Sequence, residues 1–130
     1  MERIPALEAR QNFGDVVNLA ANAKQRFLIH EKGRDRAAII PLEDLALLEG
    51  LSGNGVAVVR LTLGEIAFHL SEDLALVADR EERMIVCQNG EEVAALVPSR
   101  DLALLESLDQ RLDIEAAQQL LDVNDVGEEP

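Results

Sequence analysis

The chain has 130 residues, room for one compact domain or two very small ones, and 48% of them are apolar, enough to build a core. Aromatic residues make up 2%, which argues against an RNA base-stacking surface, and the single cysteine excludes a disulfide framework and zinc sites built from several cysteines. Twelve basic and 25 acidic residues give a formal net charge of −13.

The charge is concentrated in the second part of the chain. Residues 1–50 hold seven basic and eight acidic side chains, whereas residues 51–130 hold five basic and seventeen acidic ones. An acidic surface is common in soluble proteins, but this asymmetry indicates two parts with different roles. No apolar run approaches the ~18 residues of a membrane span. The first eleven residues lack the apolar stretch of a secretion signal, so we expect a cytoplasmic protein with no membrane partner.

An internal repeat organises the sequence. A shift of 57 residues places 3–49 on 60–106 without a gap, and 15 of the 47 pairs are identical, including the block DLALLE. Chance would give roughly four identities in a chain this rich in Leu and Ala, so we take the repeat as a duplication. The repeat divides the chain into unit 1 (1–50), a linker (51–58), unit 2 (59–106) and an acidic C-terminal tail (107–130).

Each unit opens with a short extended segment, 2–4 or 58–61, that leads into a helical stretch. Thr62 and Glu65 have the spacing of a capping box, which predicts a helix start in unit 2. Apolar residues then recur on one helix face in both units, namely Phe13, Val16, Val17 and Ala20 in unit 1, and Leu70, Leu74 and Val77 in unit 2.

A hairpin and a second helix complete each unit. The apolar triplets FLI and MIV predict buried strands, and Asn89-Gly90 predicts a tight turn because both central positions need a positive φ. Pro41 and Pro98 follow the second strand, and a Leu-rich helix begins there. The expected strand–turn–strand ranges are 27–29, 31–36 and 37–40 in unit 1, and 84–86, 88–93 and 94–97 in unit 2.

Each unit therefore has the order β-α-β-β-α. A unit of about 47 residues is marginally stable alone, so we expect the two units to pair. The predicted fold class is α+β, with two tandem units forming a pseudo-dimer and a C-terminal helical tail. The pairing can lie within one chain or between the chains of a homo-oligomer.

The tail is amphipathic and acidic. Leu108 and Leu112 extend the preceding helix, and Asp113 is predicted to cap a new short helix that carries Leu120 and Leu121 on one side. These leucines have little to pack against unless the tail folds back on the adjacent helix or docks into a groove of a basic partner. Both interpretations remain open.

Unit 1 resembles the Phd/YefM (prevent-host-death) antitoxins of bacterial type II toxin–antitoxin systems. The resemblance lies in ARQNF at 9–13, in the EKGR hairpin that ends in AAIIP at 37–41, and in LEDLALLE at 42–49. Unit 2 keeps the hairpin and the final helix but has Ala-Phe-His at 67–69 in place of Arg-Gln-Asn. A fused pair of units is also atypical of the family, which usually carries one unit that forms a homodimer.

The resemblance implies an antitoxin that neutralises a cognate toxin, usually a basic protein, through its C-terminal extension. It also implies autorepression through operator DNA. Carried over to this chain, the expected DNA-binding residues are Arg3, Arg10 and Asn12. The expected toxin-binding residues are Leu112, Leu120, Leu121, Val123 and Val126.

Other interpretations of the same residues stand beside these. Arg3, Arg10, Lys24 and Arg26 suit phosphate contacts but equally suit a solvated face balanced by nearby carboxylates. Two other functions are therefore kept as hypotheses: a DNA-binding regulator without a toxin partner, and an inhibitor whose acidic half imitates nucleic acid and binds a DNA-binding protein.

No pattern predicts catalysis. The sequence has no nucleophile motif and no phosphate-binding loop, so we expect no enzyme activity and no cofactor. His30 and Cys87 occupy matching strand positions, which favours a structural role for both. His69 and Glu72 have the spacing of two ligands on a helix, but no third ligand is evident and we expect no metal site.

Overall fold

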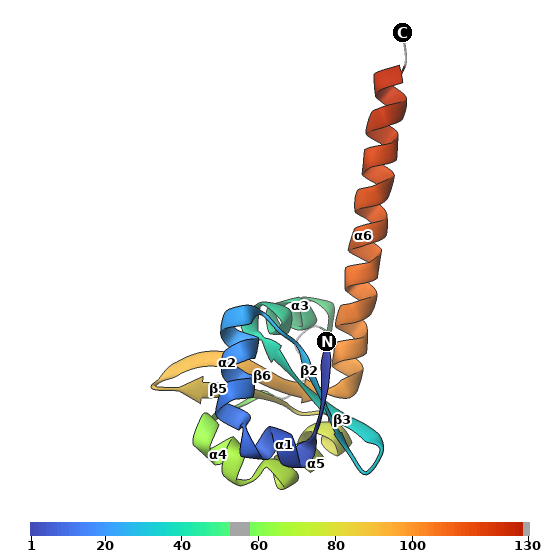
Figure 1. Ribbon diagram of the computed structural model, residues 1–130. Coiled ribbons are helices and arrows are strands. Elements are labelled where there is room, and N and C mark those ends of the chain that lie inside the picture. The colour runs from blue at the N-terminus through green and yellow to red at the C-terminus, as the bar shows by residue number, and fades with distance from the viewer. Residues whose placement is uncertain (53–57, 129–130) are drawn as a thin grey trace.

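The computed structural model describes residues 1–52 and 58–128, with side chains described for 1–51 and 58–118. These residues form a mixed α+β fold with six helices and one six-stranded sheet (Figure 1). The first half contains β1 (Glu2–Pro5), α1 (Ala6–Gln11), α2 (Phe13–Ala23), β2 (Phe27–Glu31), β3 (Arg34–Pro41) and α3 (Leu42–Ser52). The second half contains β4 (Val58–Thr62), α4 (Leu63–Phe68), α5 (Leu70–Arg80), β5 (Arg83–Gln88), β6 (Glu91–Pro98) and α6 (Ser99–Glu128).

The two halves share one sheet with the strand order β1-β2-β3-β6-β5-β4. The central strands β3 and β6 are antiparallel, and Ile39 lies opposite Leu96. Since Leu96 is the residue 57 positions after Ile39, each pairs with its own counterpart in the repeat. The outer pairs follow the same symmetry, with Ala37 opposite Pro98 and Pro41 opposite Ala94. The halves therefore join within a single chain, through the centre of a continuous sheet.

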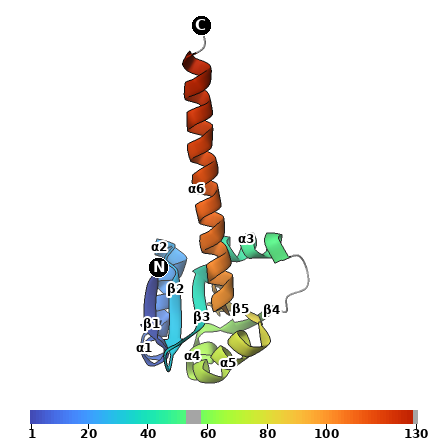
Figure 2. The ribbon, with the colours of Figure 1, turned by 90° about the vertical axis from the view of Figure 1, so that its right-hand side faces the viewer.

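Helices cover both faces of the sheet (Figures 1 and 2). One face packs against α1, α2, α4 and α5, in a core that contains Phe13, Ile39, Leu74 and Leu96. The other face packs against α3 and the first turns of α6, through leucines such as Leu48 and Leu105. Because side chains alternate along a strand, adjacent residues of β3 belong to different cores.

The helical stretch expected after the first strand is two helices in each half. Asn12 separates α1 from α2 with φ −121° and ψ 29°, and His69 separates α4 from α5 with φ −111° and ψ 30°. These non-helical conformations interrupt the helix at matching positions. The predicted capping box is confirmed, since Thr62 Oγ1 accepts from the Glu65 N–H and the Glu65 side chain accepts from the Thr62 N–H.

Both hairpins turn through two residues with positive φ. The angles are 52° and 77° at Lys32 and Gly33, and 54° and 80° at Asn89 and Gly90, as predicted for the second turn. The register shifts after Ile29 in the first hairpin and after Val86 in the second, so both carry a bulge at the same place.

Two further predictions about local structure are wrong. The turns expected at 31–36 and 88–93 have only two residues each, because β3 begins at Arg34 and β6 at Glu91. No new helix begins at Asp113, because α6 is a single helix from Ser99 to Glu128. An N-cap needs a non-helical residue, but the sequence from Ser99 to Val126 has neither Gly nor Pro to end the first helix. Asp113 instead lies in the middle of α6, with its side chain exposed to solvent. Most of the predicted linker falls on 53–57, outside the described residues, while α3 extends to Ser52 and β4 begins at Val58.

Candidate functional site

The helix α6 leaves the body of the molecule after three turns. Leu102 and Leu105 are buried against the sheet and α3, whereas every residue from 110 to 118 is exposed. Figures 1 and 2 show the rest of α6 extending away from all other elements. We call residues 110–128 the projecting segment. It is a helix with no neighbour from its own chain along 110–118.

An arginine of the first half holds α6 just below the projecting segment. Arg26 donates from Nε and Nη2 to the Asp44 carboxylate, at 2.8 and 3.0 Å, and from Nη1 to Asp109 Oδ2 at 2.6 Å. The hydrogen bond to Asp44 and then that to Asp109 raise the pKa of Arg26 above its usual range, against the opposing effect of burial. Arg26 thus connects β2, α3 and α6.

The second half has the same strand-to-helix pair without the third partner. Arg83 Nε donates to Asp101 Oδ2 at 3.0 Å, and their side chains are only 3% and 4% exposed. The residue that matches Asp109 in the repeat is Ser52, at the end of α3. The cross-half contact of Asp109 therefore depends on the residue type at this position, because α3 also reaches it but has a serine there without a carboxylate.

The projecting segment exposes apolar side chains. Leu112 is 51% exposed and Ile114 is 60% exposed, among the acidic residues Asp113 and Glu115. Of the expected toxin-binding residues, Leu112 is therefore available to a partner. The other four lie on the backbone of α6, but their side chains fall outside the described residues: Leu120, Leu121, Val123 and Val126.

The expected DNA-binding residues do not form one surface. Arg10 and Asn12 lie at the end of α1, but Arg3 points to the opposite face of the sheet, because its neighbour Ile4 packs into the core beneath α1. Arg3 donates to Asp35 Oδ1 at 2.8 Å. Asn12 donates to the backbone carbonyl of Glu8.

Among the basic residues considered for phosphate contact, Arg10 differs from the others. It is exposed, has no ion pair within the described residues, and borders a cavity of about 160 Å³ between α1 and α5. Lys24 pairs with Glu43 at 2.8 Å, and Arg26 is held by two carboxylates. Arg10 is therefore the expected DNA contact with a free guanidinium.

The second half has an aromatic residue one position after the counterpart of Arg10. Phe68 ends α4, is 73% exposed, and meets the His69 ring edge-on at a centroid distance of 4.7 Å. No sequence motif points to Phe68. Its exposure could have been predicted from its counterpart in the repeat, Gln11, because a polar residue at that position indicates that it faces solvent.

Within the described residues, no group of three His, Cys, Asp or Glu side chains is placed to hold a metal ion. The Glu72 carboxylate lies 3.7 Å from His69 Nδ1. His30 and Cys87 are half-buried beside the matching bulges of the two hairpins.

Comparisons of the chain with protein-family models, with characterised proteins and with solved structures find no significant match. Among the helices of the described residues, none combines the length and the apolar character needed to cross a membrane. The Phd/YefM resemblance therefore depends on the motifs of unit 1, and any function has to be argued from the geometry of this chain.

Proposed function

We propose that the chain is an antitoxin-like protein of a bacterial type II toxin–antitoxin system, which neutralises a basic toxin by binding it along the projecting segment of α6. One observation carries the proposal: a helix anchored in a packed core continues far beyond the body with Leu112 and Ile114 exposed. Apolar side chains on a helix without neighbours are stabilised when a partner covers them, because their apolar surface is then removed from water.

The charge of the C-terminal tail favours a basic partner. Residues 107–130 contain seven carboxylate side chains and one arginine. Such a segment attracts a cationic surface and repels nucleic acid and acidic proteins. A basic protein that presents an apolar groove fits both the charge and the exposed leucine and isoleucine.

The proposal includes two Phd/YefM-like units that pair as a pseudo-dimer within the chain. Its support is the shared element order of the two halves and the symmetric register of β3 and β6, in which Ile39 faces its own counterpart. In this arrangement one chain has the body of a dimer but only one extended C-terminal helix. We therefore expect one toxin molecule per chain.

The test uses the product of the adjacent reading frame. Expressed alone it is expected to arrest growth, and co-expression of the full chain is expected to restore growth. The double variant Leu112→Glu, Ile114→Glu should fail to restore growth and should bind the purified product at least about tenfold more weakly, because a charge replaces each apolar anchor. Both positions are exposed, so the fold is retained.

Leu47→Glu is the matched control. Leu47 is similarly exposed on α3, away from the projecting segment, and its variant should restore growth like the natural chain. Full rescue by the double variant, or an adjacent product that does not bind the chain, would contradict the proposal.

Operator binding by the first half is a second candidate function, favoured by Arg10. Its guanidinium is exposed and without an ion pair among the described residues, and Lys32 and Arg34 of the nearby hairpin are exposed in the same way. The corresponding residues of the second half, Ala67 and Glu91, offer no such charge. DNA contact would therefore involve the first half alone.

A further inference from the structure

A groove runs beside α6 on the side where β1 forms the edge of the sheet. It consists of two hollows of about 650 and 380 Å³, which share Met1 and Glu106 in their walls. Along α6 the walls extend from Ser99 to Asp109. The groove therefore ends where the projecting segment begins, and a protein bound to that segment would lie next to it.

The floor of the smaller hollow is apolar, whereas the larger hollow is lined mainly by polar and charged residues. Leu28 from β2 and Leu102 from α6 line the smaller hollow, and Ala103 lies beside them. Such a floor suits the aliphatic stem of a long side chain whose polar end stays at the rim.

The rim carries negative charge that the chain does not neutralise. Glu2 and Glu106 are exposed and have no ion pair among the described residues. Each basic residue of the groove already has a carboxylate partner: Arg3 with Asp35, Lys24 with Glu43, Arg26 with Asp44 and Asp109, and Arg100 with Glu81. Among the described residues of the groove, the groups without an ion pair are then two carboxylates, Glu2 and Glu106, and one cation, the α-amino group of Met1, so the groove keeps a negative charge that suits a cationic side chain.

We propose that this groove binds a lysine- or arginine-rich segment of the same basic protein that docks on the projecting segment. The inference rests on the proposed function, which supplies the partner. It adds a second contact. The groove on the body binds positive charge on the partner, while the projecting segment of α6 fills the apolar groove of the partner. A second copy of this chain fits poorly, because its net charge is −13.

The test reverses the two free charges in the full-length chain. The variant Glu2→Lys, Glu106→Lys is expected to bind the purified product of the adjacent reading frame about tenfold more weakly, and with a smaller dependence on salt. The control Glu8→Lys, Glu91→Lys makes the same change of charge at exposed residues of α1 and of the second hairpin. It should weaken binding by less than about threefold, through the overall field alone. Titration calorimetry at two salt concentrations measures both.

Three results would overturn the inference. If the groove variant binds like the control while Leu112→Glu, Ile114→Glu still abolishes binding, the groove plays no part and the proposed function stands. Both proposals fail if the natural chain does not bind the product. They also fail if neither the groove variant nor the double variant Leu112→Glu, Ile114→Glu changes binding. If sedimentation finds dimers of the natural chain that the groove variant disrupts, a second copy occupies the groove instead.

Discussion

Asp73 shows how a single residue can make the two halves of a repeat differ in stability. It occupies the position of Val16, is 7% exposed, and its Oδ2 atom has no hydrogen-bond partner among the described residues. Burial raises the pKa of Asp73 above its usual range, and nearby His69 opposes this only in part. The acid thus replaces an apolar residue, and one of its carboxylate oxygens is buried without a hydrogen bond in the described part of the chain.

Replacing Asp73 with the residue of the first half should stabilise the protein. Because the pKa of Asp73 is higher folded than unfolded, the native state holds its proton more tightly, and stability falls as pH rises from the unfolded pKa through the folded one. At pH values above the folded pKa this penalty is present in full. Asp73→Val should raise the free energy of unfolding by about 1–3 kcal/mol there.

Urea unfolding at several pH values measures this effect. The advantage of Asp73→Val should shrink as the pH falls to and below 3.8, the ordinary pKa of the acid, because Asp73 is then protonated in both states. The reverse change Val16→Asp should destabilise the chain at pH 7. An advantage that is the same at all pH values would show that packing, and not the carboxylate, is responsible.

At the scale of elements, an arginine–aspartate pair fastens a strand start to a helix start in each half. In the second half Arg83 and Asp101 are enclosed, whereas in the first half Arg26 also reaches Asp109 on α6. The two pairs therefore respond differently to the loss of one carboxylate.

We expect Asp101→Asn to destabilise the protein by about 3–5 kcal/mol, since it leaves the Arg83 charge buried without a counter-ion. Asp44→Asn should cost less, because Arg26 keeps Asp109 and is partly hydrated. Adding Asp109→Asn to Asp44→Asn should bring the cost closer to that of Asp101→Asn. Equal losses for the two single variants, measured by urea unfolding, would argue against this account.

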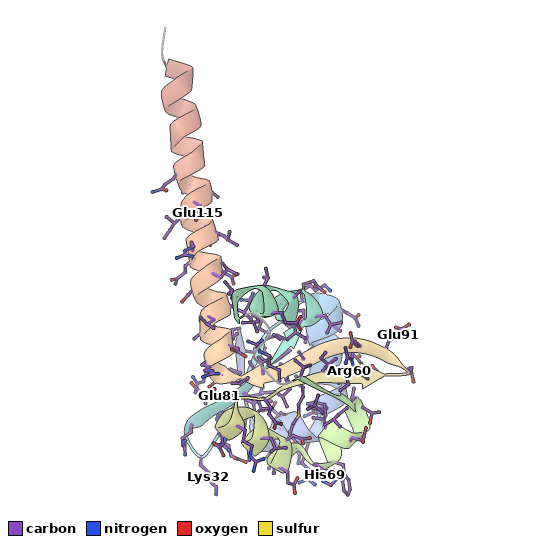
Figure 3. The ribbon with its side chains drawn as sticks, turned by 180° about the vertical axis from the view of Figure 1, so that it is seen from behind. Lys32, Arg60, His69, Glu81, Glu91 and Glu115 are labelled. Carbon is purple, nitrogen blue, oxygen red and sulfur yellow. The ribbon has the colours of Figure 1, made fainter. Side chains whose placement is uncertain are left out.

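Over the whole molecule, the two hairpin tips point in different directions and carry opposite charge. Figure 3 shows Lys32 and Glu91 at well-separated ends of the body. Lys32 and Arg34 make the first tip basic, whereas Glu91 makes the second acidic, and Glu92 beside it pairs with Arg60. The exposed carboxylates of the second half would repel a DNA duplex, which favours contact through the first half alone.

This asymmetry predicts the behaviour of DNA binding in salt. With a duplex from the region upstream of the gene, Arg10→Ala should weaken binding about three- to tenfold and reduce the slope of log affinity against log salt by about 1. Arg80→Ala removes an exposed arginine of the second half, and should change neither quantity. Gel shifts across a salt series decide the matter, and equal effects of the two variants would exclude a specific role for Arg10.

The local features of this protein follow from its sequence. The repeat, the Asn89-Gly90 turn, the capping box at Thr62 and the apolar helix faces arise from residues close together in the chain, whose spacing and backbone preferences are visible without a fold. For the same reason, the two α+β halves could be predicted from the sequence. The break at Asn12 was missed because Asn is tolerated both inside helices and between them.

Only the tertiary structure decided how these parts meet. It pairs Ile39 with Leu96 inside one chain, separates Arg3 from Arg10 by the thickness of the sheet, and brings Arg26 to Asp109, 83 residues away. Such contacts depend on strand order and on which face each side chain occupies, and local periodicity does not encode the order in which strands assemble. The groove beside α6 exists for the same reason, since β1 and α6 come from opposite ends of the sequence.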